Sequence, residues 1–184
     1  MDKASNKTHK TAIVVIPPSD LWPAIQMIRS QHDRHFHRWM PHITLIYPFR
    51  HRNEFGMLAG RLSQACAAIA PFELTLANFK FFHHRKQNYT IWLAPEPADA
   101  LIGLQTALWQ VVPDCDEVRR NEEGFTPHLS VGQVEGRESQ TKLIKELQNS
   151  WQAVKFPVVE VSLIWRNDPP DDIFCIDRTI KLPT

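Results

Sequence analysis

Residues 41–45 read Pro41-His42-Ile43-Thr44-Leu45, and residues 127–131 read Pro127-His128-Leu129-Ser130-Val131. Both stretches follow one pattern: proline, histidine, aliphatic, hydroxyl, aliphatic. Because residues i and i+2 of a strand point to the same face, each histidine shares a face with the hydroxyl two positions later. A single match would most simply be an ordinary histidine in a strand. The repeated match predicts two equivalent strands that bring their polar faces to one place.

The segments around the two stretches repeat an order of predicted elements. A helix followed by a hairpin occupies residues 53–94 and again residues 138–182, and each unit follows one of the Pro-His strands. The hydrophobic patterns predict strands at 11–16, 43–49, 72–82, 89–94, 128–134, 158–165 and 173–182, and helices at 19–31, 53–70, 99–112 and 138–151. We therefore expect an α+β fold. Two pseudo-twofold-related lobes, each an antiparallel sheet with helices packed outside, would form a central cleft.

Bulk properties limit the class of protein. The chain has 184 residues, of which 43% are hydrophobic and 22% are charged, as in globular proteins. We predict a disordered tail over residues 1–10 and a single bilobal domain over residues 11–184. The three widely spaced cysteines and the lack of a long apolar run favour a cytoplasmic protein that does not enter a membrane. The net charge of +1 means that an anionic ligand must be held by a local cluster.

Two facing histidines suit chemistry at a phosphodiester. A neutral imidazole can accept a proton and an imidazolium can donate one near neutral pH, so the pair can supply a base and an acid on opposite sides of phosphorus. The two hydroxyls can donate hydrogen bonds to the non-bridging phosphate oxygens. No metal ion or other cofactor is needed for this scheme, and we predict none.

The motifs resemble those of the 2H phosphoesterase superfamily, which includes the so-called 2′-5′ RNA ligases and cyclic nucleotide phosphodiesterases. The resemblance rests on residues 42–49 and 125–132 and extends over residues 11–182. It implies catalytic roles for His42 and His128, and phosphate binding by Thr44 and Ser130. The second motif carries serine in place of threonine, which the family pattern allows.

Other residues near the motifs are weaker candidates. Four arginines in the loops before the motifs could contact a phosphate, a fifth could border the cleft, and three aromatic residues could stack on a base: Arg34, Arg38, Arg119, Arg120 and Arg166, and Tyr47, Phe82 and Phe125. The alternative for each of the four loop arginines is a solvated charged loop, and the alternative for each aromatic residue is a place in the core. The tip at residues 83–86 could touch nucleic acid but is expected to be solvated. His32, His35 and His37 lie close together with only Asp33 to complete a ligand set, so we predict no metal site.

The predicted function is metal-independent hydrolysis of a 2′,3′-cyclic phosphate or a related nucleotide or RNA phosphodiester. Cleavage or formation of a 2′-5′ RNA linkage, or hydrolysis of an ADP-ribose cyclic phosphate, is an alternative with the same residues. A non-catalytic RNA- or nucleotide-binding module is a rival of another class. Two intact histidines and the small net charge argue against it. The expected partner is a nucleotide or an RNA end that carries a phosphodiester, bound by a monomer.

Overall fold

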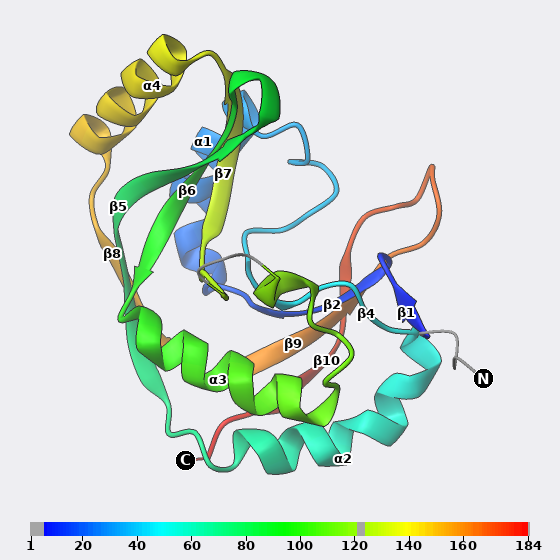
Figure 1. Cartoon of the computed structure of the whole chain (residues 1–184). Helices are drawn as coiled ribbons and strands as arrows, with labels where there is room; N and C mark the ends of the chain where they lie inside the picture. The colour runs from blue at the N-terminus through cyan, green and yellow to red at the C-terminus, as the bar shows by residue number, and fades with distance from the viewer. Residues whose placement is uncertain (1–5, 121–123, 184) are drawn as a thin grey trace.

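The computed structural model describes residues 6–120 and 124–183. It contains two four-stranded antiparallel sheets, with strand orders β10-β9-β2-β3 and β7-β6-β5-β8, and a two-stranded pair of β1 and β4 (Figure 1). The strands are β1 (Lys7–Thr8), β2 (Thr11–Val15), β3 (Ile43–Ile46), β4 (Phe49–Arg50), β5 (Phe72–His84), β6 (Asn88–Glu96), β7 (Leu129–Glu135), β8 (Val154–Val158), β9 (Glu160–Trp165) and β10 (Cys175–Lys181). The α-helices are α1 (Trp22–His32), α2 (Phe55–Cys66), α3 (Ala98–Val111) and α4 (Arg137–Ser150). The predicted α+β class with two sheet-rich lobes is confirmed.

The duplication is real, but its two halves exchange strands. The order β2-α1-β3-α2-β5 is repeated as β6-α3-β7-α4-β9, apart from the short strands β4 and β8, which have no counterparts. The sheet of β2 and β3 takes β9 and β10 from the second half, because β9 pairs with β2, and the sheet of β6 and β7 takes β5 from the first half, because β5 pairs with β6. Two helices cross over in the same way, α1 to pack against β7 and α3 to pack against β3. The repeat therefore begins two strands and one helix before the helix-hairpin unit predicted from the sequence.

Strand β8 leads the chain from one sheet into the other. Phe72–Leu76 of β5 pairs antiparallel with Val154–Val158, and the chain then continues from β8 directly into β9 of the other sheet. The sequence analysis missed β8. Its signal is weak, because only Phe156 and Val158 are buried and Pro157 interrupts the strand pattern.

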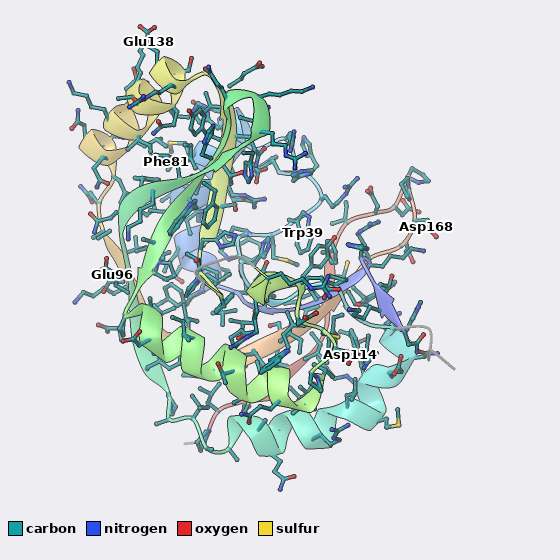
Figure 2. All side chains as sticks on the ribbon, in the orientation of Figure 1. Trp39, Phe81, Glu96, Asp114, Glu138 and Asp168 are labelled. Atoms are coloured by element: carbon teal, nitrogen blue, oxygen red, sulfur yellow. The ribbon has the colours of Figure 1, made fainter. Side chains whose placement is uncertain are left out.

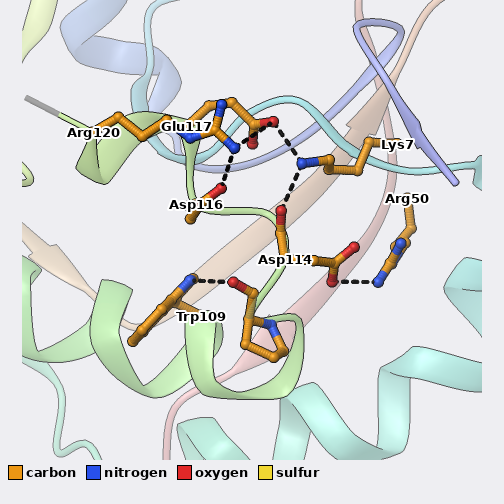
Figure 3. Close-up of polar contacts among 8 residues, drawn as sticks. Lys7, Arg50, Trp109, Asp114, Asp116, Glu117 and Arg120 are labelled. Atoms are coloured by element: carbon orange, nitrogen blue, oxygen red, sulfur yellow. Dashed lines mark hydrogen bonds and ion pairs between the residues drawn. The ribbon is translucent and has the colours of Figure 1, made fainter. Parts of the chain in front are cut away.

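The amino-terminal segment is more ordered than predicted. Lys7 and Thr8 form β1 and pair with Arg50 and Phe49. The Lys7 Nζ also donates to the Asp114 carbonyl and to Glu117 Oε1, each at 2.6 Å (Figure 3). The prediction of a disordered tail is thus wrong from Lys7 onward, because partners far along the chain hold the segment; residues 1–5 lie outside the described part.

Helix boundaries differ modestly from the predictions. Helices α1 and α2 begin at Trp22 and Phe55 rather than at residues 19 and 53, because a short 3-10 turn leads into each of them. Helix α2 ends at Cys66 rather than near residue 70. Across residues 6–120 and 124–183, no helix is both long and apolar enough to cross a membrane.

Candidate active site

A cavity of about 730 Å³ lies where the two sheets meet. The edge strands β3 and β7 come together there, and His42 and His128 are the residues directly before these strands. Thr44 and Ser130 occupy the second position of each strand. All four of these predicted residues line the cavity. The spacing in the sequence therefore corresponds to one shared face in space.

Both histidine rings are held by the same backbone contact. The Nδ1 of His42 lies 2.7 Å from the carbonyl oxygen of Met40, and the Nδ1 of His128 lies 2.8 Å from that of Thr126. Because a carbonyl oxygen can only accept, each Nδ1 carries the proton and donates it. In the neutral ring, Nε2 then keeps its lone pair and can accept a proton. The two halves of the repeat thus present their imidazoles in one tautomer.

Burial favours the neutral form of both rings. The pKa of His42 is lowered to about 4, chiefly by burial and to a lesser extent by the charges of Arg29 and His128, against the opposing effects of the Met40 carbonyl and Asp33. Burial also lowers the pKa of His128, and the Thr126 carbonyl opposes it. At neutral pH both histidines are therefore able to accept a proton.

The aromatic surroundings of the two histidines differ. Trp39 stacks on His42 with ring centroids 4.6 Å apart, and Phe174 stacks on Trp39 at 3.7 Å. Phe82 meets the ring of His128 edge to face at 4.9 Å. Figure 2 shows Trp39 between the two sheets. The sequence analysis did not single out Trp39, because a tryptophan in a polar loop gives no sign of its stacking partner.

A buried ion pair forms another part of the cavity wall. The Nε and Nη2 of Arg29 each lie 2.9 Å from Asp33 Oδ2, and the two side chains are 2% and 4% exposed. Gln133 of β7 donates from Nε2 to Asp33 Oδ1 at 3.2 Å and accepts from the Arg34 backbone N–H at 3.1 Å. The pair therefore ties the end of α1 to β7. The i,i+4 spacing of Arg29 and Asp33 in the sequence is typical of an ion pair on a helix. Their burial could not be predicted from that spacing.

We expect Arg29→Met to destabilise the protein by about 3–5 kcal/mol, because it leaves the Asp33 carboxylate buried without its cation. The double variant Arg29→Met/Asp33→Leu should regain much of that loss, since an apolar pair replaces the ion pair. Arg120→Met, which breaks the exposed i,i+4 pair with Asp116, is the matched control and should change stability little. Urea unfolding of the four proteins measures the differences. An Arg29→Met protein as stable as the control would show that the pair is not structural.

Four weaker candidates from the sequence also lie at the cavity. Arg34, Tyr47 and Phe125 are in its wall, as is Phe82. The Tyr47 hydroxyl donates to the His9 carbonyl at 3.3 Å, and burial raises the pKa of that hydroxyl. His83 and His84, expected at a solvated tip, are also in the wall. The tip folds beside the cavity because β5 extends to His84.

The structure places the other four arginines outside the described cavity wall. Arg119 Nη1 donates to Gln105 Oε1 at 2.6 Å, and its guanidinium lies 4.4 Å from the Trp109 ring centroid. Arg120 pairs with Asp116 and Arg38 with Asp172, at 2.7 and 2.5 Å. Arg166 donates to the Asn167 carbonyl. Arg38 and Arg166 are nevertheless close enough for their charges to oppose the rise in the pKa of Tyr47 in the cavity wall. Contact of these four arginines with a substrate stays a prediction.

The three clustered histidines have separate surroundings. His35 lines the cavity, His37 lies against Phe36, and His32 packs where a side chain at Gly132 would collide with it. Over residues 6–120 and 124–183, no three or more His, Cys, Asp or Glu side chains are grouped so that they could hold a metal ion.

Comparisons with known proteins agree with this geometry. The protein resembles a Geobacillus kaustophilus protein named as a phosphoesterase, with 29% identity over 124 residues, 67% of this chain and 68% of the relative. It resembles an RNA 2′,3′-cyclic phosphodiesterase of Methanothermobacter thermautotrophicus with 33% identity over 99 residues, half of each chain. Two crystal structures share the fold at 15% identity. TT0787 of Thermus thermophilus has a TM-score of 0.61, over 94% of this chain and 97% of that one. Escherichia coli LigT complexed with 3′-AMP has a TM-score of 0.58, over 98% and 100%.

The fold, the paired motifs and these relatives define a two-histidine phosphoesterase, a hydrolase by class. More particularly, the chain belongs to the 2′-5′ RNA ligase superfamily, whose family model matches residues 17–170. The family resemblance and the enzyme class predicted from the sequence are thereby confirmed.

Proposed function

We propose that the protein hydrolyses a 2′,3′-cyclic phosphate at the end of a nucleotide or RNA, without a metal ion, using His42 and His128. One observation carries the proposal. Two half-buried imidazoles, each with Nδ1 bound to a carbonyl, line one cavity beside hydroxyls from the same two strands. This arrangement offers two proton-transferring groups and two hydrogen-bond donors around a single phosphorus atom.

The reaction follows from that arrangement. One histidine is neutral and takes a proton from water through Nε2 as the water oxygen attacks phosphorus. The other is protonated and gives its Nε2 proton to the ribose oxygen as the bond from that oxygen to phosphorus breaks. Thr44 and Ser130 donate hydrogen bonds to the non-bridging oxygens as negative charge gathers there. The product is a phosphate monoester with a free ribose hydroxyl beside it.

The relatives and the cavity size support a nucleotide substrate. The Methanothermobacter relative is named for an RNA 2′,3′-cyclic phosphodiester, and LigT has been crystallised with 3′-AMP, ATP and NADP⁺. The volume of about 730 Å³ falls within the range of ordinary small-ligand sites. The aromatic side chains in the wall, including Phe125 and Tyr47, suit the faces of a base.

The pH optimum of kcat/KM should lie below neutrality. Hydrolysis needs one neutral and one protonated histidine, and in the free enzyme burial lowers both pKa values, that of His42 to about 4. We therefore expect a bell-shaped kcat/KM with an optimum below the ordinary histidine pKa of about 6.5, rather than the range of about 6 to 7.5 that unperturbed histidines suggest. The optimum of kcat should lie at higher pH than that of kcat/KM, because a bound phosphate stabilises the imidazolium form of the histidines. A kcat/KM profile that keeps rising above pH 7.5 would contradict a histidine acid.

A substrate screen after dialysis against EDTA tests the function. The substrates are 2′,3′-cyclic nucleotides, 3′,5′-cyclic nucleotides, 2′-5′-linked dinucleotides and ADP-ribose 1″,2″-cyclic phosphate. We expect turnover of the 2′,3′-cyclic phosphates, undiminished by chelation. Activity that is lost with EDTA and restored by a divalent ion would indicate metal-generated hydroxide and overturn the mechanism. Turnover of the 2′-5′ linkage alone would overturn the proposed substrate.

A further inference from the structure

A second cavity, of about 580 Å³, lies on β5 beside α4. Its wall combines side chains of β5 and β6 with side chains of the first two turns of α4: Phe79, Lys80, Phe81 and Trp92, and Arg137, Gln140, Thr141 and Ile144. Among the described residues this wall holds two cations and no carboxylate. Figure 2 shows Phe81 beside α4, and its ring is 45% exposed. The cavity is therefore positive and has an aromatic face open to solvent.

The position of the second cavity follows from the topology. Strand β5 pairs with β8 only over Phe72–Leu76. Within the described chain, residues 77–84 of β5 therefore have no neighbouring strand on the edge that faces β8. The Gln148 side chain covers the first free groups, accepting from the Phe79 N–H at 3.0 Å and donating to the Ala77 carbonyl at 2.9 Å. Beyond Phe79 the edge opens into the cavity.

The two cavities share a wall. Trp92 of the second cavity stacks on Phe82 of the first, with centroids 4.8 Å apart, and its ring lies 5.9 Å from that of His128. The Lys80 Nζ lies 5.9 Å from the same indole. The Trp92 indole N–H is buried and has no acceptor among the described residues. A buried donor without an acceptor is costly, and a ligand oxygen or ring nitrogen could satisfy it.

We propose that this second cavity binds the part of an RNA strand next to the reacting end, with Phe81 stacked on a base and Lys80 and Arg137 contacting phosphates. The inference rests on the proposed function and deepens it, since it makes an oligonucleotide rather than a mononucleotide the preferred substrate. Stacking faces interleaved with cations are the usual means of binding single-stranded nucleic acid. An acidic peptide pairing with the free β5 edge is the rival occupant. The shared wall with the His128 site favours RNA, because two neighbouring cavities suit consecutive nucleotides of one strand.

The test compares 2′,3′-cyclic AMP with a tetranucleotide that ends in a 2′,3′-cyclic phosphate. We expect Phe81→Ala and Arg137→Gln each to lower kcat/KM for the tetranucleotide on the order of 10-fold, as loss of one stacked base or phosphate contact does. Turnover of 2′,3′-cyclic AMP should stay unchanged in both variants. Two controls match them: Met57→Ala removes another exposed apolar side chain, and Lys145→Gln removes a cation from the exposed face of α4. Neither should affect either substrate.

Salt dependence gives a second readout. For the tetranucleotide, the slope of log(kcat/KM) against log salt should shrink by about 0.7 for each phosphate contact removed. Equal kcat/KM values for both substrates in the wild type, with no effect of Phe81→Ala or Arg137→Gln, would overturn the second site and leave the proposed function standing. Turnover of neither substrate would instead overturn the proposed function. Competition by a poly-glutamate peptide that these variants abolish, without any tetranucleotide preference, would assign the cavity to a peptide.

Discussion

His42→Ala and His128→Ala are each expected to lower turnover of a 2′,3′-cyclic phosphate by about 10²- to 10⁴-fold, the usual contribution of one general acid or base. In the proposed mechanism, each substitution removes an Nε2 that either takes the proton of the attacking water or supplies the proton of the leaving oxygen. Neither ring is deep in the core, since both are half-buried in the cavity wall. Circular dichroism and melting temperature should therefore stay close to those of the wild type.

Single-turnover rates separate this expectation from a structural role. The double variant His42→Ala/His128→Ala should be scarcely slower than either single variant, because groups that act as a unit are strongly non-additive. His37→Ala is the matched control, since His37 is exposed and lies outside the described cavity wall. A folded single variant that keeps near-normal turnover would remove that histidine from the mechanism. Additive losses would show that the two rings act separately.

The pattern in the sequence predicted the centre of the site because it is local. A strand period of two puts each histidine and its hydroxyl on one face, and two copies in a duplicated fold imply that these faces meet. The Nδ1 contacts are local as well, since each acceptor carbonyl lies only two residues before its histidine. They were missed because a sequence pattern does not record where a carbonyl points.

The rest of the site depends on strand exchange, which no local pattern records. Gln133 reaches Asp33 only because α1 of the first half packs on β7 of the second. Trp39 reaches Phe174 only because its loop folds onto the segment before β10. Such contacts join residues that are distant along the chain, and hydrophobic periodicity predicts the elements without their partners.

Charge was the least reliable guide. Of the five candidate arginines, Arg34 alone is in the described cavity wall, whereas Arg29, at a helical position, was not considered. A cation in a loop before a motif has many possible partners, and here Asp116 and Asp172 take two of them. The same applies to Lys7, whose place in a polar terminus predicted disorder, although it holds the loop before the second motif through Glu117.

Thr44→Val and Ser130→Ala are expected to lower kcat on the order of 10²- to 10³-fold each, the range found when one hydrogen-bond donor to a developing oxyanion is removed. Negative charge on the non-bridging oxygens is greatest in the transition state, so kcat should fall much more than KM rises. Valine keeps the shape of threonine and favours a strand, and Ser130 is only half-buried, so the fold should persist.

Thr90→Val distinguishes this role from a general effect of polarity in the cavity. Thr90 also lines the cavity from β6, but its hydroxyl lies 3.0 Å from His84 Nε2 and already has a partner. Its loss should therefore affect kcat far less than the loss of Thr44 or Ser130. Equal effects of all three substitutions would point to cavity polarity rather than to phosphate contacts. Lower melting temperatures with unchanged kcat would mean that the two hydroxyls serve strand packing, and would leave the transition-state charge to be stabilised by the histidines and Arg34.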